Sequence, residues 1–286
     1  MLCASLGLLA EDAALALGAT RTVEAAGDAA ALLSLLTKVD DEVIDAADFH
    51  GGPMRRGGHR ALRRRVRSYL APTLDSVLTG RPATDEARCV LAAEVGRQLQ
   101  RLAGSRDRLD RLHGVLAAGW ETQVRAVDIL SRHPGESTPA DVARVTASIS
   151  GDWLLMITMV GGLPPDASRE ISDAEIAAFD RWGWHIQRAD ALADFIKDVG
   201  EGLANSWAGM TCERRFGSAY HEAVVRRDVA ALERMLGECA HACVATAAEV
   251  ETSAHEVVGL GDVAGDLAWI HGMLLGRWRA RRGGAA

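Results

Sequence analysis

The chain has 286 residues, 48% of them hydrophobic and 25% charged, which is enough to bury a large core. Its formal net charge of −7 excludes the basic character of a general nucleic-acid-binding protein, so we expect no nucleic-acid partner. The 5 cysteines form no dense disulfide framework, which favours a reducing, cytoplasmic location. The uncharged stretch 153–165 is too short to span a bilayer, and residues 1–18 lack the basic start of a signal peptide.

Apolar residues recur at spacings of three and four along most of the chain, whereas no segment alternates apolar and polar residues like a strand. This period predicts helices at 5–17, 23–48, 60–79, 84–103, 106–132, 139–162, 172–204, 211–226, 229–257 and 262–281. The sequence shows no internal repeat and no low-complexity linker. We therefore expect one all-α domain that covers residues 1–286.

Several predicted helix starts carry recognisable signals. Thr138-Pro139 is typical of an N-cap followed by a proline at the first helical position. Ser172 and Glu175 have the spacing of a capping box, and Asp228 is expected to cap the helix that follows it.

The stretch KVDDEVID, residues 38–45, places three aspartates and a glutamate directly after an apolar helical run. At about 100° per residue, Asp41, Asp45 and Asp48 fall within about 60° of one another on a helix, while Asp40 points elsewhere. The stretch is therefore not a uniformly solvated turn. It predicts a polar stripe that ends in three carboxylates.

A second acidic stretch, QRADALADFIKDVGEGLAN, covers residues 187–205. One face of the predicted helix, spanning roughly 80° of arc, collects Asp190, Asp194, Asp198, Glu201 and Asn205. Carboxylates at this spacing repel one another by a few tenths of a kcal/mol per pair, unless a cation lies between them. Mg²⁺ takes oxygen ligands and is typically held by one or two carboxylates together with substrate phosphates. Two such faces across a bundle predict several Mg²⁺ ions around a diphosphate, where they help the leaving group to depart.

These two stretches resemble the aspartate-rich motifs of the class I all-α isoprenoid synthase superfamily, and squalene and phytoene synthases most of all. KVDDEVID is similar to the first motif of that group, DxxxD, and LADFIKDVGEG (192–202) is similar to its second motif. The segment from Gln187 to Asp194 also looks like the second motif of chain-elongating prenyl synthases. The resemblance implies that Lys38 is a basic residue that binds diphosphate. It also implies four metal-binding carboxylates, Asp41, Asp45, Asp198 and Glu201.

The same resemblance implies an isoprenoid-synthase-type helical bundle around a central cavity. It implies a Mg²⁺-dependent terpene synthase or prenyltransferase that ionises an allylic prenyl diphosphate, farnesyl or geranylgeranyl diphosphate, and directs the carbocation to a cyclised or coupled terpenoid. Head-to-head joining of two prenyl diphosphates is the alternative reaction, although Gly202 stands where the second motif has an aspartate. A non-catalytic helical binding protein is the alternative class. A second substrate, either another prenyl diphosphate or a different acceptor, is possible in this interpretation. Assembly as a homodimer is also possible.

The candidate site residues come from the two stretches and their surroundings. The predicted catalytic carboxylates are Asp41, Asp45, Asp194 and Asp198, and the predicted metal ligands are these four with Asp190, Glu201 and Asn205. The predicted substrate contacts are Lys38, Arg188, Lys197, Gly151, Trp153, Trp184 and Trp207. Gly151 is included because a glycine lets a substrate approach the backbone, and the tryptophans because aromatic faces stabilise cations. Further diphosphate candidates are Arg181, Arg214, Arg215 and Arg277.

Two other patterns have simpler interpretations. RRGGHRALRRRVR (55–67) is rich in arginine but has no interleaved aromatic residues, so we interpret it as a solvated helix start. Cys239, His241 and Cys243 have a spacing that puts the histidine on the opposite helix face from the cysteines. We therefore expect core packing here and no zinc site.

Overall fold

The computed structural model describes residues 2–45, 59–130, 138–201 and 207–283, and this part of the chain is all-helical with no strand. The elements are α1 (Leu2–Ala16), α2 (Val23–Asp45), α4 (His59–Thr79), α5 (Ala87–Leu102), α6 (Arg106–Leu130), α7 (Pro139–Gly161), α8 (Asp173–Glu201), α9 (Trp207–Phe216), α10 (Ser218–Arg226), α11 (Val229–Cys243), α12 (Ala247–Glu256), the short 3₁₀ helix η1 (Val258–Leu260) and α13 (Val263–Gly283). The all-α prediction is confirmed.

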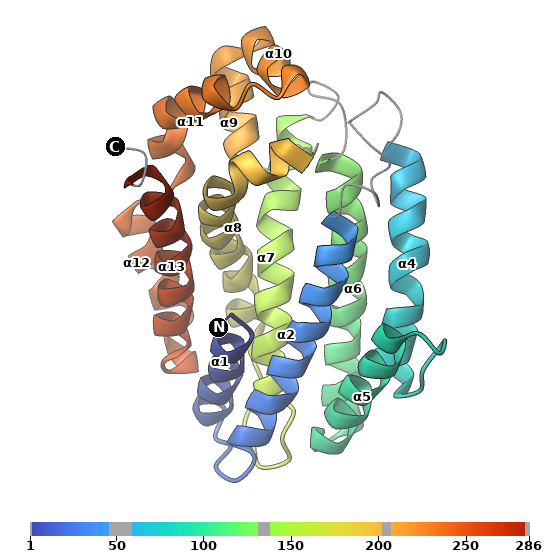
Figure 1. The fold of residues 1–286 in the computed structure, drawn as a ribbon. Helices are drawn as coiled ribbons and strands as arrows, with labels where there is room; N and C mark the ends of the chain where they lie inside the picture. Colours follow the sequence, from blue (N-terminus) through green and yellow to red (C-terminus); the bar gives the residue numbers. More distant parts are fainter. Residues whose placement is uncertain (1, 46–58, 131–137, 202–206, 284–286) are drawn as a thin grey trace.

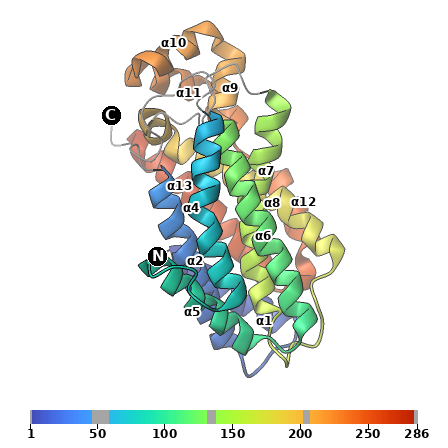
Figure 2. The same cartoon turned by 90° about the vertical axis from the view of Figure 1, so that its right-hand side faces the viewer.

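The long helices form two packed layers (Figures 1 and 2). One layer runs α4, α6, α7, α8, and the other runs α5, α2, α1, α13. The layers join at their edges, where α4 packs on α5 and α8 packs on α13. In the middle, α7 packs on both α1 and α2. The shorter helices α9, α10 and α11 cover one end of the bundle (Figure 1).

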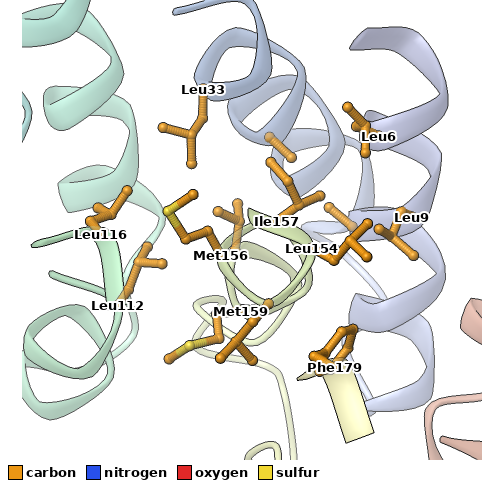
Figure 3. Close-up of a cluster of buried hydrophobic side chains, with 14 of the residues drawn as sticks. Leu6, Leu9, Leu33, Leu112, Leu116, Leu154, Met156, Ile157, Met159 and Phe179 are labelled. Carbon is orange, nitrogen blue, oxygen red and sulfur yellow. The ribbon is translucent and has the colours of Figure 1, made fainter. Parts of the chain in front are cut away.

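Apolar side chains from both layers fill the middle of the bundle (Figure 3). Leu33 of α2, Leu116 of α6 and Met156 of α7 are 0%, 0% and 4% exposed. The described side chains thus pack against one another in the middle of the bundle. The central cavity expected from the sequence is not confirmed and stays a prediction. A shallow surface depression lies at the end of the bundle opposite α9–α11, lined by Arg108, Met159 and Glu170 among others. None of the described helices has the length and apolar character needed to cross a membrane.

Two predicted helices are wrong in extent because each is interrupted. The predicted helix 211–226 is divided between α9 and α10 at Gly217, whose φ of 52° breaks the helical path. The predicted helix 229–257 is divided between α11 and α12, because Thr246 starts a new helix with a capping box to Glu249. Val244, between the two, is extended.

The helix-start signals are confirmed, and so is the core packing expected for Cys239 and Cys243. Thr138 caps α7, with Pro139 in its first turn, and Asp228 caps α11. The Ser172 hydroxyl accepts from the Glu175 backbone N–H at 3.3 Å. Cys239 and Cys243 are buried in the packing between α9 and α11, while His241 is exposed.

The backbones of α7 and α8 approach one another at two glycines. A Cβ atom on Gly183 would lie 2.7 Å from the Gly151 Cα and 2.2 Å from the carbonyl oxygen of Ala147. A Cβ atom on Gly151 would lie 2.9 Å from the carbonyl oxygen of Phe179. Only residues without side chains permit this contact, which fixes α8 against α7.

We expect Gly183→Ala to lower the free energy of unfolding by roughly 1–3 kcal/mol, because an added methyl group forces the two backbones apart. Gly114 on α6 has no atom within 4 Å of its Cβ position and serves as the control. Gly114→Ala is expected to leave stability unchanged or to raise it, since alanine favours the helix. Denaturant unfolding of both variants tests the contact, and equal stabilities would contradict it.

The loop after α7 holds the start of α2 through one carboxylate. Asp166 accepts hydrogen bonds from the Thr22 hydroxyl and from the backbone N–H groups of Thr20 at 3.0 Å and Arg21 at 2.8 Å. The Thr22 hydroxyl and these backbone donors hold the pKa of Asp166 well below its usual range. The ionised carboxylate therefore stabilises the junction between the two layers.

The stabilising effect of Asp166 should depend on pH with a definite sign. Because its folded-state pKa is lowered, the contribution is fully present above the unfolded-state pKa of about 3.9, and it is lost progressively as the pH falls from there through the folded-state pKa. We expect Asp166→Asn to melt a few degrees below the unaltered protein at pH 7, and this difference in melting temperature to shrink steadily as the pH is lowered below about 4. A difference in melting temperature that is constant with pH would contradict the assignment.

Candidate functional site

The two acidic stretches lie on α2 and α8, whose C-terminal ends both reach the end of the bundle that α9–α11 cover (Figure 1). The last turn of each helix contains acidic residues and no basic residue. This arrangement is unfavourable, because the partial negative charge at a helix C-terminus normally attracts cations and repels carboxylates. The last turns of α2 and α8 therefore carry negative side chains at positions where the helix dipole already disfavours negative charge.

Asp190 is affected by carboxylates of both acidic stretches. Burial first, and then the charges of Asp194 and Asp41, raise the pKa of this carboxyl group to about 7. Asp194 lies one turn along α8, but Asp41 belongs to α2. The charge of one α2 carboxylate therefore acts on a carboxylate of α8, and a shared site between the two stretches stays a prediction.

A chain of hydrogen bonds from α7 holds Asp190 in place. The Ser150 hydroxyl donates to the side-chain oxygen of Gln187 at 2.7 Å. The Gln187 amide nitrogen in turn donates to Asp190 at 3.3 Å. These two hydrogen bonds orient the Asp190 carboxylate from the side of α7, and they use one of its two oxygens.

Two cationic side chains approach the carboxylates. Lys38 forms ion pairs with Asp41 at 3.2 Å and with Glu42 at 3.0 Å. Burial disfavours its charge, but the two carboxylates outweigh burial and raise the pKa of Lys38. On the opposite side, Arg277 of α13 lies 3.7 Å from an oxygen of Asp194. Lys38 and Arg277 therefore flank the acidic cluster from α2 and α13.

Two further side chains line the α2 side of the cluster. Gln123 of α6 donates to Asp41 at 3.4 Å, a long hydrogen bond. Trp153 of α7 donates from its indole nitrogen to the Thr37 hydroxyl at 3.3 Å, one turn below Asp41. The predicted substrate contact Trp153 is thus placed next to the carboxylates, and its ring is partly exposed.

Three other predicted substrate contacts pack together on the side of α8 that faces α9 and α11. Arg188 donates to the carbonyl oxygens of Cys243 at 3.2 Å and Val244 at 2.8 Å. It also lies over the Trp207 ring, 5.4 Å from the centroid. Trp184 packs edge-on against Trp207 with ring centroids 4.7 Å apart. These contacts serve to attach α11 to α8, and a role in substrate binding stays a prediction.

Gly151 has a structural role that the sequence analysis did not predict. The glycine was expected to let a substrate approach the backbone, which stays a prediction, and the backbone of α8 lies against its Cβ position. Its lack of a side chain is explained by the contact with Gly183.

The remaining predicted residues are placed only in part. Asp198 and Lys197 lie near the end of α8, where Lys197 helps to lower the pKa of Glu42, after the larger effect of Lys38. Burial raises the pKa of Tyr220 on α10, and Asp198 adds to this effect. The side chains of Asp45 and Glu201, and all of Asn205 and Asp48, lie outside the described part of the chain.

Over the described ranges, no three His, Cys, Asp or Glu side chains are grouped so that they can hold a metal ion. The predicted Mg²⁺ site therefore depends on carboxylates whose side chains lie outside that part of the chain. The donors themselves suit a hard cation, since they are carboxylate oxygens. The number of ions and their ligands stay a prediction.

Sequence reasoning missed Ser150, Gln187 and Gln123, the polar residues that support the carboxylates. Gln187 carried a usable signal, because it precedes Asp190 by three positions on the same helix face. Gln123 and Ser150 carried none, since only the packing of α6 and α8 on α7 brings them near the acidic residues.

Because the folded-state pKa of Asp190 is raised, folding binds a proton and stability falls as the pH rises from about 4 to about 7. We expect Asp190→Asn to be more stable than the unaltered protein at pH 8, by up to a few kcal/mol at about 1.4 kcal/mol per pKa unit. The gain should vanish near pH 4. Denaturant unfolding at both pH values checks this, with the exposed Asp85→Asn as control. A less stable Asp190→Asn at pH 8 would contradict the assignment.

Comparison with known proteins identifies no family for this chain. No protein-family model matches it, and neither a curated protein nor a solved structure matches it. The resemblance of the two acidic stretches to isoprenoid synthase motifs therefore stays a prediction.

Proposed function

We propose that this protein is a Mg²⁺-dependent class I terpene synthase or prenyltransferase that ionises an allylic prenyl diphosphate. The observation that supports this most is that the charges of Asp41 on α2 and Asp194 on α8 both act on the buried Asp190 and raise its pKa. Carboxylates that repel one another in this way are stabilised by a cation placed beside them. Farnesyl and geranylgeranyl diphosphate are the substrates we favour.

The carboxylates of both faces are assigned to metal binding. Asp41 and Asp45 of α2 and Asp190, Asp194, Asp198, Glu201 and Asn205 of the second stretch are the proposed ligands. Bound Mg²⁺ neutralises the diphosphate and assists its departure as a Lewis acid. Gln123 and Gln187 hold Asp41 and Asp190 by hydrogen bonds, which keeps the two faces oriented toward each other.

The cationic side chains are assigned to the diphosphate. Lys38 and Arg277 flank the carboxylates, and each is about half exposed, so both can turn toward an anion. Trp153, one turn below Asp41, presents an aromatic face that stabilises a carbocation. The indole N–H bond to Thr37 fixes the orientation of that ring.

The finding that the described side chains form no complete metal site gives weight to a second candidate, a helical binding protein without catalysis. The two candidates differ in metal coupling. In a synthase, the diphosphate completes the metal coordination, so Mg²⁺ and diphosphate bind better together than alone. A binding protein of the other class shows no such coupling.

The first experiment is incubation of the protein with geranyl, farnesyl and geranylgeranyl diphosphate, with and without Mg²⁺. Released pyrophosphate and extracted products are both measured. We expect Mg²⁺-dependent release with at least one substrate, and the mass of the product separates cyclisation from head-to-head coupling. No release with any substrate, combined with no Mg²⁺-dependent binding of pyrophosphate, would contradict the proposal.

Substitution of the carboxylates tests the site directly. We expect Asp41→Asn and Asp194→Asn each to lower turnover by about 100-fold or more, since loss of even an outer-shell partner typically costs 10–100-fold. Both variants should stay folded, because each removes a charge from a repelling cluster. Asp28→Asn, on the exposed face of α2 far from the cluster, is the matched control and should keep full turnover. Normal turnover in Asp41→Asn would exclude this site.

A further inference from the structure

One side of α13 faces solvent along most of the helix. α13 lies at the edge of its layer, where it packs on α8, α1 and α12 (Figure 1). Its inward positions recur every three or four residues and are buried, namely Val263, Leu267, Ile270 and Leu274. The positions two residues after each of these are exposed, namely Gly265, Trp269, Gly272 and Gly276. The two sets lie about 200° apart on the helix, so they occupy opposite faces.

The composition of this outward face is unusual for a surface in water. Trp269 is 49% exposed. In the described part of the chain, nothing lies within 4 Å of the Cβ positions of Gly265, Gly272 and Gly276. Glycine inside a helix is less favourable than alanine, and no close approach within one molecule requires it here, in contrast to Gly183. The outward face of α13 therefore combines one large apolar side chain with three open positions.

This face is complementary to a second copy of itself in the antiparallel orientation. When Trp269 lies opposite Gly272 of the second copy, two-fold symmetry also places Gly265 opposite Gly276, because both pairs are centred on the same point of the helix. Each large side chain then meets a position without a side chain. At the glycine pair the two backbones can approach closely.

The two ends of the same face carry opposite charges. Asp262 precedes the first turn of α13, Arg279 lies near the end of the helix, and both are exposed. Both continue the spacing of three and four, which is that of a coiled-coil seam. In the register that pairs Trp269 with Gly272, Asp262 lies opposite Arg279 of the second copy at both ends. A parallel pairing would place like charges together, so charge selects the antiparallel arrangement.

The neighbouring helix α1 extends this face. The Cβ atom of Ala16 lies 3.3 Å from the Cβ position of Gly261, directly before α13. Leu8 and Leu15 of α1 are each 55% exposed. A specific interface buries about 800 Å² per partner, roughly 20–30 residues, which is more than the outward face of one helix holds. The exposed leucines of α1 supply further apolar area beside α13.

We propose that the outward face of α13 is a self-association surface, on which two copies of this chain pair as antiparallel helices with Trp269 of each copy over Gly272 of the other. The contact is isologous, since the same patch serves both partners, and it closes as a dimer. The inference is independent of the proposed function, because none of these residues belongs to the acidic cluster.

Sedimentation equilibrium over protein concentrations from about 1 to 100 μM measures the association. We expect a monomer–dimer equilibrium for the unaltered protein. Gly272→Leu fills the space opposite Trp269, and Trp269→Ala removes the large side chain, so each should raise the dissociation constant about tenfold or more. Gly114→Leu is the matched control, because Gly114 of α6 is also an exposed helical glycine with nothing within 4 Å of its Cβ position, and it should leave the dissociation constant unchanged. Far-UV circular dichroism checks that each variant keeps its helices.

Charge reversal tests the antiparallel register. Asp262→Arg and Arg279→Asp should each raise the dissociation constant, because like charges then face one another at both ends. The double variant restores opposite charges and should recover most of the loss. A double variant weaker than both single variants would overturn the register.

The association itself has a plain negative outcome. An unaltered protein that stays monomeric at all these concentrations would overturn the inference and assign the face to a different partner. A dimer whose dissociation constant is unchanged by both Gly272→Leu and Trp269→Ala would show that another surface holds it, and would overturn the inference as well.

Discussion

The backbones of α7 and α8 touch at Gly151 and Gly183, and this contact sets where each carboxylate of α8 lies. α7 is the central helix, since it packs on α6, α1 and α2 as well as on α8. A close approach at the glycines therefore positions α8 relative to α2, because α7 packs on both helices. The charge of Asp41 on α2 contributes to the raised pKa of Asp190 on α8. Without the glycine contact, larger side chains would hold α8 farther from α7 and separate the two acidic faces.

At the acidic cluster of α2 and α8, the stability of the fold favours fewer carboxylates, whereas the candidate function requires them. Carboxylates at the C-termini of two helices repel one another and the helix dipoles, and Asp190 loses hydration as well. Asp40 adds a buried carboxylate on the other side of α2. A chain selected for stability alone would replace these residues with alanine, leucine or lysine. Unfavourable charge concentrated in one place is typical of sites that bind a cationic or metal-complexed ligand.

Distance along the sequence does not decide which residues lie at the acidic cluster and which only hold helices together. Arg188, Trp184 and Trp207 are close to the acidic stretch in sequence, yet their contacts attach α11 to α8. Arg277 is distant in sequence, yet α13 brings it to Asp194. Two residues of a helix share a face when their separation fits the 3.6-residue period, and Trp184 does not fit that period with Asp194 of α8.

The sequence by itself determined the helical class, the long helices with their caps, and the acidic faces of α2 and α8, because these depend on periodicity and on contacts within a few residues. It also contained the signals that divide α9 from α10 and α11 from α12, Gly217 and the Thr246 capping box, which the apolar periodicity obscured. Only the tertiary structure decided that the charge of Asp41 acts on Asp190, that Gln123 and Ser150 support these carboxylates, and that α8 packs against Gly151. These outcomes depend on the distance between helices, which small residues and buried polar groups set, and no local pattern encodes that distance.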